Sequence, residues 1–282
     1  MKQRSILVVG GPDSGKSNFI GRAWLALDSG QHSLVATGMP ENIEYVLETA
    51  EHICNGNFAP RTEHSEAARN VMIEVRAAEG SESARIVIPD IKGELWKTAV
   101  ETCEIEAEWM DVLEEADGAI LFVRCGSTEN VAPLDWVTSG ALLAKRTRPA
   151  TQGMPTQVML CELLRFMEQK LACRRDGTAP RVSLIVAAWD KLDEATRIKG
   201  PEAYLAKEYP LLSGKLSDSP LNVKVFGLSI VGGDLQDDPS YRASYLQGSV
   251  NEHGWVMTKA DVGDEWCANP DLTLPIGWVV GL

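Results

Sequence analysis

The sequence has few of the residues that stabilise disulfide-rich or zinc-dependent folds. Only 6 of its 282 residues are cysteine and only 4 are histidine. No two cysteines have the C-x-x-C spacing, and the histidines lie in separate segments without cysteines at the spacing of a zinc site. We therefore expect free thiols in a reducing compartment, with neither a disulfide framework nor a zinc centre.

Long apolar runs are also missing. No apolar stretch reaches the roughly 20 residues that a membrane helix needs. The run that begins at Ser5 is shorter than the apolar core of a signal peptide and ends in glycines. These absences predict a cytoplasmic protein without membrane association.

Basic residues are outnumbered by acidic ones. Lys and Arg total 27, Asp and Glu total 40, and the formal net charge is −13. Because a phosphate backbone attracts basic surfaces, this balance argues against a general nucleic-acid binder. A content of 44% hydrophobic and 24% charged residues is ordinary for a globular protein whose length allows a full core.

Short β-branched runs alternate with helical patterns along the chain. This alternation predicts an α/β fold, a three-layer sandwich with a mostly parallel six-stranded sheet. The segment Arg76–Ser83 is too short for a crossover helix, so the two runs that it joins should pair as an antiparallel hairpin. One long helix is expected over Glu94–Glu115. The six expected strands are Ser5–Val9, Val71–Val75, Ala84–Ile88, Ala119–Val123, Val182–Ala187 and Val223–Leu228.

Two segments do not follow this alternation. Residues at about 126–154 form a long stretch with basic residues, Pro and Gly, which we interpret as an insertion. Residues 233–282 have no clear period. We therefore expect one domain over 1–232 and an irregular C-terminal extension over 233–282 that packs on it.

The strongest motif is the run from Gly10 to Ser17, which matches G-x-x-x-x-G-K-[ST] between an expected strand and an expected helix. Glycines let backbone N–H groups turn toward phosphate oxygens, and the helix N-terminus adds partial positive charge. Lys16 should reach the β- and γ-phosphates, and the Ser17 hydroxyl should bind Mg²⁺. The residues of this segment expected to contact nucleotide are Gly11, Asp13, Ser14, Gly15, Lys16, Ser17 and Asn18.

Two residues of this loop are unusual for a phosphate site. Pro12 has no N–H to donate, and Asp13 places a negative charge near the phosphates. The Asp13 carboxylate must either point away from the phosphates or cap the turn, and the sequence leaves both open.

An acidic residue at the end of a neighbouring strand should hold the magnesium water shell. Asp90 follows an expected strand and begins D-x-x-G, whose Gly93 could approach the γ-phosphate. A second magnesium ligand is expected between the first helix and the hairpin, where Thr62 is preferred over Ser65. The predicted metal ligands are therefore Ser17, Thr62 and Asp90.

The segment after the strand Val182–Ala187 carries a base-reading pattern. Guanine-binding proteins have N-K-x-D at this place, and here Lys191 and Asp193 match while Asp190 replaces the Asn. A carboxylate at Asp193 would accept from the guanine N1–H and exocyclic amine, which adenine cannot supply together. Ser229, after the last expected strand, would back the base through a backbone N–H.

Together these motifs resemble a Ras-like P-loop GTPase of the TRAFAC class over roughly Ser5 to Gly232. The runs Pro60-Arg61-Thr62 and Met154-Pro155-Thr156 resemble the bacterial double-GTPase domains linked to conflict or defence systems. The resemblance implies GTP and GDP as ligands, Mg²⁺ as cofactor and a two-state switch. It also implies catalytic roles for Lys16, Thr62 and Glu94, where Glu94 stands at the place of a water-orienting Gln.

The function predicted from the sequence is a GTP-binding and hydrolysing switch that signals its nucleotide state to a protein partner. The carboxylate of Glu94 would repel the γ-phosphate, so hydrolysis should be slow without a partner. The alternatives are a nucleotide-dependent interaction module with negligible turnover and an ATP-using P-loop kinase. The kinase alternative leaves Lys191 and Asp193 without a role.

Overall fold

The structure is a computed structural model of the chain. It describes residues 2–40, 43–60, 70–79, 83–89, 93–105, 107–133, 154–174, 177–260 and 263–282.

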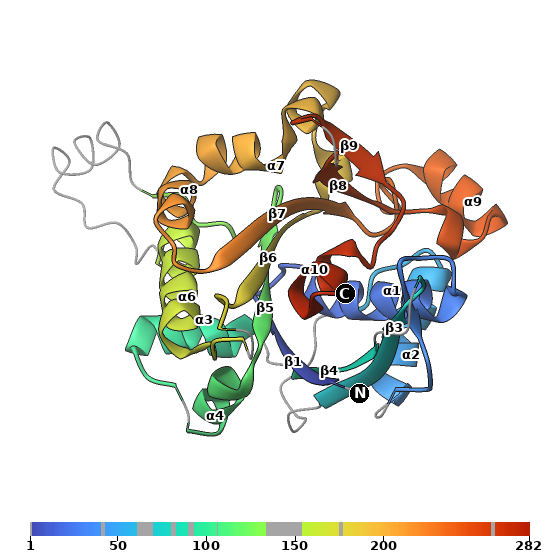
Figure 1. Ribbon diagram of the computed structural model, residues 1–282. Coiled ribbons are helices and arrows are strands. Elements are labelled where there is room, and N and C mark those ends of the chain that lie inside the picture. The colour runs from blue at the N-terminus through green and yellow to red at the C-terminus, as the bar shows by residue number, and fades with distance from the viewer. Residues whose placement is uncertain are drawn as a thin grey trace, which may run out of the picture.

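One mixed sheet of nine strands runs through the described part of the molecule (Figure 1). Its order is β2-β3-β4-β1-β5-β6-β7-β8-β9. The strands are β1 (Lys2–Val9), β2 (Leu34–Ala36), β3 (Asn70–Ala77), β4 (Ser83–Pro89), β5 (Gly118–Arg124), β6 (Arg181–Ala187), β7 (Asn222–Ser229), β8 (Trp255–Lys259) and β9 (Trp266–Asn269).

The α/β class, all six expected strands and the antiparallel hairpin are confirmed, but the sheet is larger and more antiparallel than predicted. Strands β4, β1, β5, β6 and β7 form a parallel centre, with Val9 opposite Leu121 in the β1–β5 pair. The pairings β2–β3, β3–β4, β7–β8 and β8–β9 are antiparallel. Strands β2, β8 and β9 were not expected, because they are short and their residues give no continuous β-branched run.

Helices cover both faces of the sheet and make three layers. In β1, Ile6 and Val8 pack with α1, α2 and α10 in one core, whereas Leu7 and Val9 pack with α3, α4, α6, α7 and α8 in another. This division follows from the alternation of side chains along a strand. The helices are α1 (Lys16–Ser29), α2 (Ile43–Cys54), α3 (Gly93–Thr102), α4 (Ala107–Glu115), α6 (Thr156–Lys170), α7 (Glu194–Glu208), α8 (Pro210–Ser217), α9 (Pro239–Gln247) and α10 (Leu274–Val280).

The helix expected over Glu94–Glu115 is two helices. Cys103 follows the end of α3 with φ 58°, a left-handed conformation that a helix cannot contain. The chain then begins α4 at Ala107. The apolar pattern predicted a continuous helix because it reports which residues are buried and not where the chain turns.

The segment 233–282, expected to be irregular, contains α9, β8, β9 and α10. Helix α10 lies beside α1 on one face of the sheet (Figure 1). The Ser183 hydroxyl on β6 donates to the Pro275 carbonyl at 2.7 Å. Gly118 on β5 allows this close packing, since a Cβ there would lie 2.6 Å from Val279 Cγ1. The segment therefore completes both the sheet and the core.

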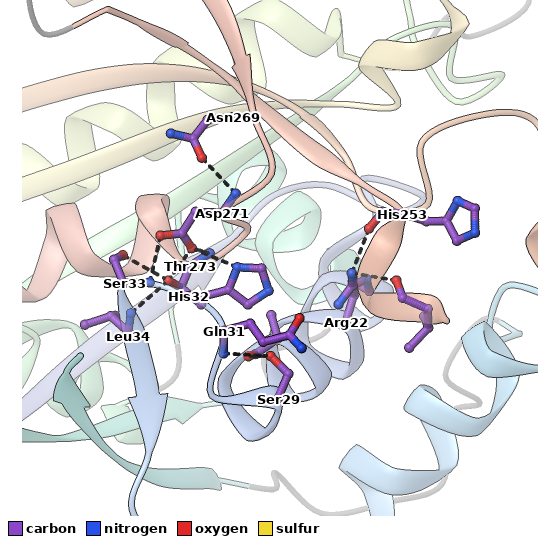
Figure 2. Close-up of polar contacts among 12 residues, drawn as sticks. Arg22, Ser29, Gln31, His32, Ser33, Leu34, His253, Asn269, Asp271 and Thr273 are labelled. Atoms are coloured by element: carbon purple, nitrogen blue, oxygen red, sulfur yellow. Dashed lines mark hydrogen bonds and ion pairs between the residues drawn. The ribbon is translucent and has the colours of Figure 1, made fainter. Parts of the chain in front are cut away.

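Two polar clusters join the C-terminal segment to the N-terminal part of the chain (Figure 2). In the first, the buried Arg22 guanidinium on α1 donates to the carbonyls of Ile230, Val250 and His253 at 3.1, 2.9 and 2.8 Å. Burial lowers the pKa of Arg22 to about 10, which still leaves the side chain charged at neutral pH. The cation is therefore held by backbone carbonyl dipoles.

In the second cluster, Asp271 holds the loop between α1 and β2. Its carboxylate accepts from the Ser33 backbone N–H at 2.9 Å and from the Thr273 hydroxyl at 2.6 Å, and it lies 3.4 Å from His32 Nδ1 (Figure 2). Burial alone would raise the pKa of Asp271, but the hydrogen bonds from His32, Ser33 and Thr273 outweigh it and lower the pKa. The charged Asp271 carboxylate therefore joins the residues before α10 to the loop before β2.

Across the described ranges, no helix combines the length and the apolar character that a bilayer crossing requires.

Candidate nucleotide-binding site

The phosphate-loop segment connects the carboxyl end of β1 to the start of α1. Gly15 precedes α1 with φ 94°, and Asp13 has φ 58°, so the loop turns back on itself before the helix begins. The Lys16 ammonium donates to the Gly10 and Gly11 carbonyls at 2.7 and 3.0 Å and to the Ser14 hydroxyl at 3.1 Å. The loop thus wraps around one buried ammonium group at a helix N-terminus, which is an arrangement suited to phosphate.

The side chain of Asp13 points to the end of β5. Its two carboxylate oxygens accept from the Arg124 guanidinium and, at 2.9 Å, from the Ser127 hydroxyl. The same Arg124 Nη1 also donates to the Asp13 backbone carbonyl at 3.1 Å. Of the two arrangements that the sequence left open for Asp13, the structure has the carboxylate engaged by the strand end rather than capping its own turn.

A cavity of about 410 Å³ opens beside this loop. Its wall contains residues from the phosphate loop, α1, the segment after α2 and the loops that follow β6 and β7. The charged and polar residues among them are Asp13, Asn18, Arg124, Asp190, Lys191, Asp234 and Gln236. Because the phosphate loop and the loops after β6 and β7 follow the carboxyl ends of parallel strands, the cavity lies where ligands bind in open α/β sheets.

A smaller cavity of about 60 Å³ lies on the other side of the phosphate loop. It is lined by Gly11, Pro12 and Ser14, together with Lys97 of α3 and residues of α6. Phe122 and Arg124, both of β5, line both cavities.

Asp190 lines the larger cavity, whereas Ser229 is fully buried and is not among the described residues of its wall. Asp190 lies in a short 3₁₀ turn, Trp189–Lys191, that begins after Ala188 at φ 57°. Burial raises the pKa of Asp190, and a hydrogen bond from Ser229 opposes that shift. Trp189, fully buried, packs on Gly227, where a Cβ would lie 2.8 Å from its ring. Packing of this tryptophan therefore fixes the turn that carries Asp190.

The ammonium of Lys191 lies 3.6 Å from Asp234 Oδ2 at the mouth of the larger cavity. The other carboxylate oxygen of Asp234 accepts from the backbone N–H groups of Gln236 and Asp237 at 2.8 and 3.0 Å. These backbone hydrogen bonds lower the pKa of Asp234. The sequence analysis missed Asp234, whose only signal is its place after a Gly pair that follows an expected strand.

The structure places Asp193 differently from Asp190 and Lys191. Asp193 is the N-cap of α7, and its carboxylate accepts from the Thr196 backbone N–H at 3.0 Å and from the Thr196 hydroxyl at 2.8 Å. These two hydrogen bonds lower the pKa of this exposed carboxyl group. Asp193 is not among the described residues that line the larger cavity, so the structure brings two of the three predicted base-motif residues to its wall.

Phe58 and Arg124 also line the cavity and were not predicted as site residues. Phe58 follows α2, and the next residue, Ala59, donates its backbone N–H to Asn18 Oδ1 at 2.8 Å. This bond fixes the segment after α2 against the first helix. Arg124 could have been suspected only from its position as the last residue of a strand that ends at the site.

The other predicted residues lie in α1, at the start of α3 or outside the described residues. Ser17 is in the first turn of α1, and Gly93 and Glu94 are the first residues of α3. Thr62 and Asp90 lie outside the described residues.

Among the described residues, Ser17 is the one predicted magnesium ligand. The Ser17 hydroxyl is an oxygen donor of the type that magnesium prefers, at the helix end where Lys16 is held. Among the described residues no group of three or more His, Cys, Asp or Glu side chains could hold a metal ion. From the described residues alone, a magnesium ion at Ser17 would need phosphate oxygens or water to complete its coordination.

Comparisons with known proteins agree with this geometry at the level of the family. No curated protein matches the chain. A family model described as Double-GTPase 1 matches residues 7–279, a range that runs from β1 into α10 and includes the phosphate loop and the cavity. The predicted resemblance to double-GTPase domains is therefore confirmed, and the chain belongs to the Double-GTPase 1 family.

Proposed function

We propose that this chain is a Mg²⁺-dependent GTPase that acts as a switch and signals its nucleotide state to a protein partner. One observation carries the proposal. The phosphate loop and the loops after β6 and β7 line a single cavity of about 410 Å³, which is large enough for a base and ribose beside a phosphate site.

The phosphates would lie on the loop from Gly10 to Gly15. The buried Lys16 ammonium is already directed at the loop by three acceptors and would exchange them for β- and γ-phosphate oxygens. Ser17, with Thr62 and Asp90, would hold magnesium, which neutralises phosphate charge when it is bound. Positioning and charge neutralisation would then supply most of the catalysis.

Hydrolysis requires a water molecule in line with the γ-phosphate. We assign its orientation to Glu94 and Thr62, and the sensing of the γ-phosphate to Gly93. Because a carboxylate at Glu94 repels the γ-phosphate, we expect slow turnover without a partner.

The base would enter the larger cavity between the loops after β6 and β7. We assign its recognition to Asp190, Lys191, Asp193 and Ser229. Asp190 and Lys191 line that cavity and support the assignment. Asp193 would need to release Thr196, which now donates to both of its carboxylate oxygens.

The free thiols of all six cysteines support a reducing compartment, and we place the protein in the cytoplasm. We further propose a bacterial conflict or defence system as its setting, on the basis of the double-GTPase family. The GTPase domain is assigned to 1–232 and the extension to 233–282.

Calorimetry of the full chain with GTP, GDP and ATP, each with and without Mg²⁺, tests the proposal. We expect GTP and GDP to bind at least about tenfold more tightly than ATP, and Lys16→Ala to abolish binding. Lys170→Ala removes a lysine on the far end of α6 that pairs with Glu114, and it serves as the matched control. Equal affinity for ATP and GTP would contradict the guanine assignment.

A second candidate is an interaction module that binds nucleotide without hydrolysing it. Pro12 and Asp13 favour it, since one removes a phosphate donor and the other adds negative charge to the loop. In that case phosphate release stays at background while GTP still raises the melting temperature. Mg²⁺-dependent phosphate release that Lys16→Ala abolishes would exclude this candidate.

A further inference from the structure

The phosphate loop contains a carboxylate, although its proposed ligand carries several negative charges. Asp13 occupies the fourth position of the eight-residue motif, where the backbone turns through a left-handed conformation at φ 58°. Two unit charges about 6 Å apart in a partly solvated protein environment repel each other strongly enough to change affinity by a factor of ten or more. Phosphate binding by this loop therefore needs a positive charge that compensates Asp13, or a side-chain orientation that directs the Asp13 carboxylate away from the phosphates.

Arg124 supplies the positive charge and also holds the Asp13 carboxylate in one orientation. Strand β5 lies next to β1, with Val9 opposite Leu121, so the loop after β1 and the last residues of β5 begin side by side. The Arg124 guanidinium bonds to the Asp13 carboxylate and, from the same nitrogen, to the Asp13 carbonyl. Both side chains are about a quarter exposed, with a relative exposure of 27% for each. This partial burial makes the ion pair stronger than a fully exposed one.

Ser127 restricts the carboxylate further. Its hydroxyl donates to Asp13 Oδ2 at 2.9 Å, which leaves the other oxygen to Arg124. The carboxylate is thus turned toward the end of β5, and its rotation about the side-chain bonds is restricted. The backbone of Asp13 is held in the same contact, because its carbonyl accepts from Arg124.

We infer that Arg124 is a positioning residue of the phosphate site, which cancels the charge of Asp13 and fixes the backbone of the loop in its phosphate-binding conformation. The inference rests on the proposed function, since it concerns the affinity of the same loop for nucleoside triphosphate. It assigns Arg124 no contact with the nucleotide. The guanidinium acts only through Asp13.

The test compares Arg124→Gln, Asp13→Asn and the double variant by calorimetry with Mg²⁺–GTP. Asn tolerates the left-handed region well, so Asp13→Asn keeps the backbone conformation. We expect Arg124→Gln to weaken binding at least about tenfold, because Asp13 then faces the phosphates uncompensated. Asp13→Asn should bind as tightly as the original chain or more tightly, and the double variant should recover most of the loss.

Arg165→Gln is the matched control, since Arg165 forms an i,i+3 pair with Glu162 on the surface of α6. Melting temperatures of all variants separate a loss of folding from a loss of binding. If Arg124→Gln does not fold, the nucleotide affinity of Asp13→Asn tests the inference by itself. If the pair only supported the structure of the loop, Asp13→Asn would bind nucleotide more weakly. If Arg124 cancels the charge of Asp13, Asp13→Asn binds at least as tightly as the original chain.

Three results would overturn the inference. The first is unchanged affinity in Arg124→Gln. The second is a loss that Asp13→Asn does not rescue, which would mean that the guanidinium contacts the nucleotide itself. The third is weaker binding in Asp13→Asn. Failure of the original chain to bind any nucleotide would instead contradict the proposed function, so the two failures are distinguishable.

Discussion

At the scale of single residues, the carboxyl groups around the larger cavity have opposite environments. Burial raises the pKa of Asp190, whereas backbone N–H donors lower that of Asp234. The two groups follow neighbouring strands, β6 and β7, so they approach the same cavity from adjacent loops. A base in this cavity would meet one carboxyl group that protonates more readily than usual and one that stays ionised.

Asp193 can be tested because its two roles are separable by substitution. We expect Asp193→Ala to reduce the preference for GTP over ATP on the order of tenfold, through loss of a charged acceptor. The variant also removes the N-cap of α7. The measurement is competition binding with fluorescent GTP against unlabelled GTP and ATP.

Thr196→Ala is the control for Asp193. It removes the hydroxyl that Asp193 accepts from and weakens the same cap, but it leaves the carboxylate in place. Equal effects of the two variants on base preference would show that Asp193 serves only the helix.

The loop from Gly10 to Ser17 was largely predictable from the sequence, and the loops after β6 and β7 less so. The run from Gly10 to Ser17 is contiguous, so its loop, helix start and lysine contacts follow from local geometry. Arg124 and Asp234 reach the site through strand order and loop path, which a linear pattern does not contain. Asp193 matched a motif, yet its local cap with Thr196 competes for the same carboxylate.

At the scale of secondary structure elements, five of the six predicted strands form the parallel centre of the sheet. A strand covered on both faces needs a continuous apolar run, and β5 is buried from Gly118 to Val123. The strand β9 is half exposed and β2 has three residues, so neither carries that signal. Their place in the sheet depends on partners that lie far away in the sequence.

Helix α7 contains a kink that depends on a glycine. Gly200 has φ 82° inside the helix, and a Cβ there would lie 2.1 Å from Trp266 Nε1 on β9. We expect Gly200→Ala to lower the free energy of unfolding by more than about 2 kcal/mol, because it combines backbone strain with a steric clash. Urea unfolding followed by tryptophan fluorescence measures this loss.

Gly177→Ala separates the two causes. Gly177 has a similar φ of 78°, but a Cβ there meets nothing within 4 Å. The expected loss is about 1 kcal/mol, the cost of the left-handed conformation alone. A Gly200→Ala variant no less stable than Gly177→Ala would contradict the packing of Trp266 on the kink.

At the scale of the whole molecule, Asp271 makes the stability of the fold depend on pH. Its pKa is lowered in the folded chain, so its charged form stabilises the fold above the pKa of about 4 that it has when unfolded. That stabilisation is lost as the pH falls below about 4. With solvent screening at this partly exposed position, we expect on the order of 1 kcal/mol.

The free energy of unfolding of Asp271→Asn, measured between pH 3 and pH 7, tests this contribution of Asp271. The variant should be less stable than the original chain at pH 7 and should lose less stability on acidification. Asp237→Asn, a substitution at an exposed carboxylate, should leave the pH profile unchanged. Parallel pH profiles for Asp271→Asn and the original chain would contradict the assignment.

The C-terminal segment should also be needed for a stable sheet. In a chain that stops at Gly232, the edge of β7 loses its pairing with β8. Such an open edge pairs readily with other chains. We expect this truncated chain to form aggregates on size-exclusion chromatography, whereas a chain that stops at Val280 should elute as the original does.

The packing of α10 on β5 and β6 has a consequence for synthesis. The face of the sheet that α10 covers belongs to strands that are translated before α10. Ile276 and Val279 can pack on this face only when translation has passed residue 280. The loop from Gly10 to Ser17 is translated long before α10, although β1, which leads into that loop, shares a core with α10. A ribosome-bound chain that has not yet exposed α10 would therefore leave this apolar face of the sheet uncovered.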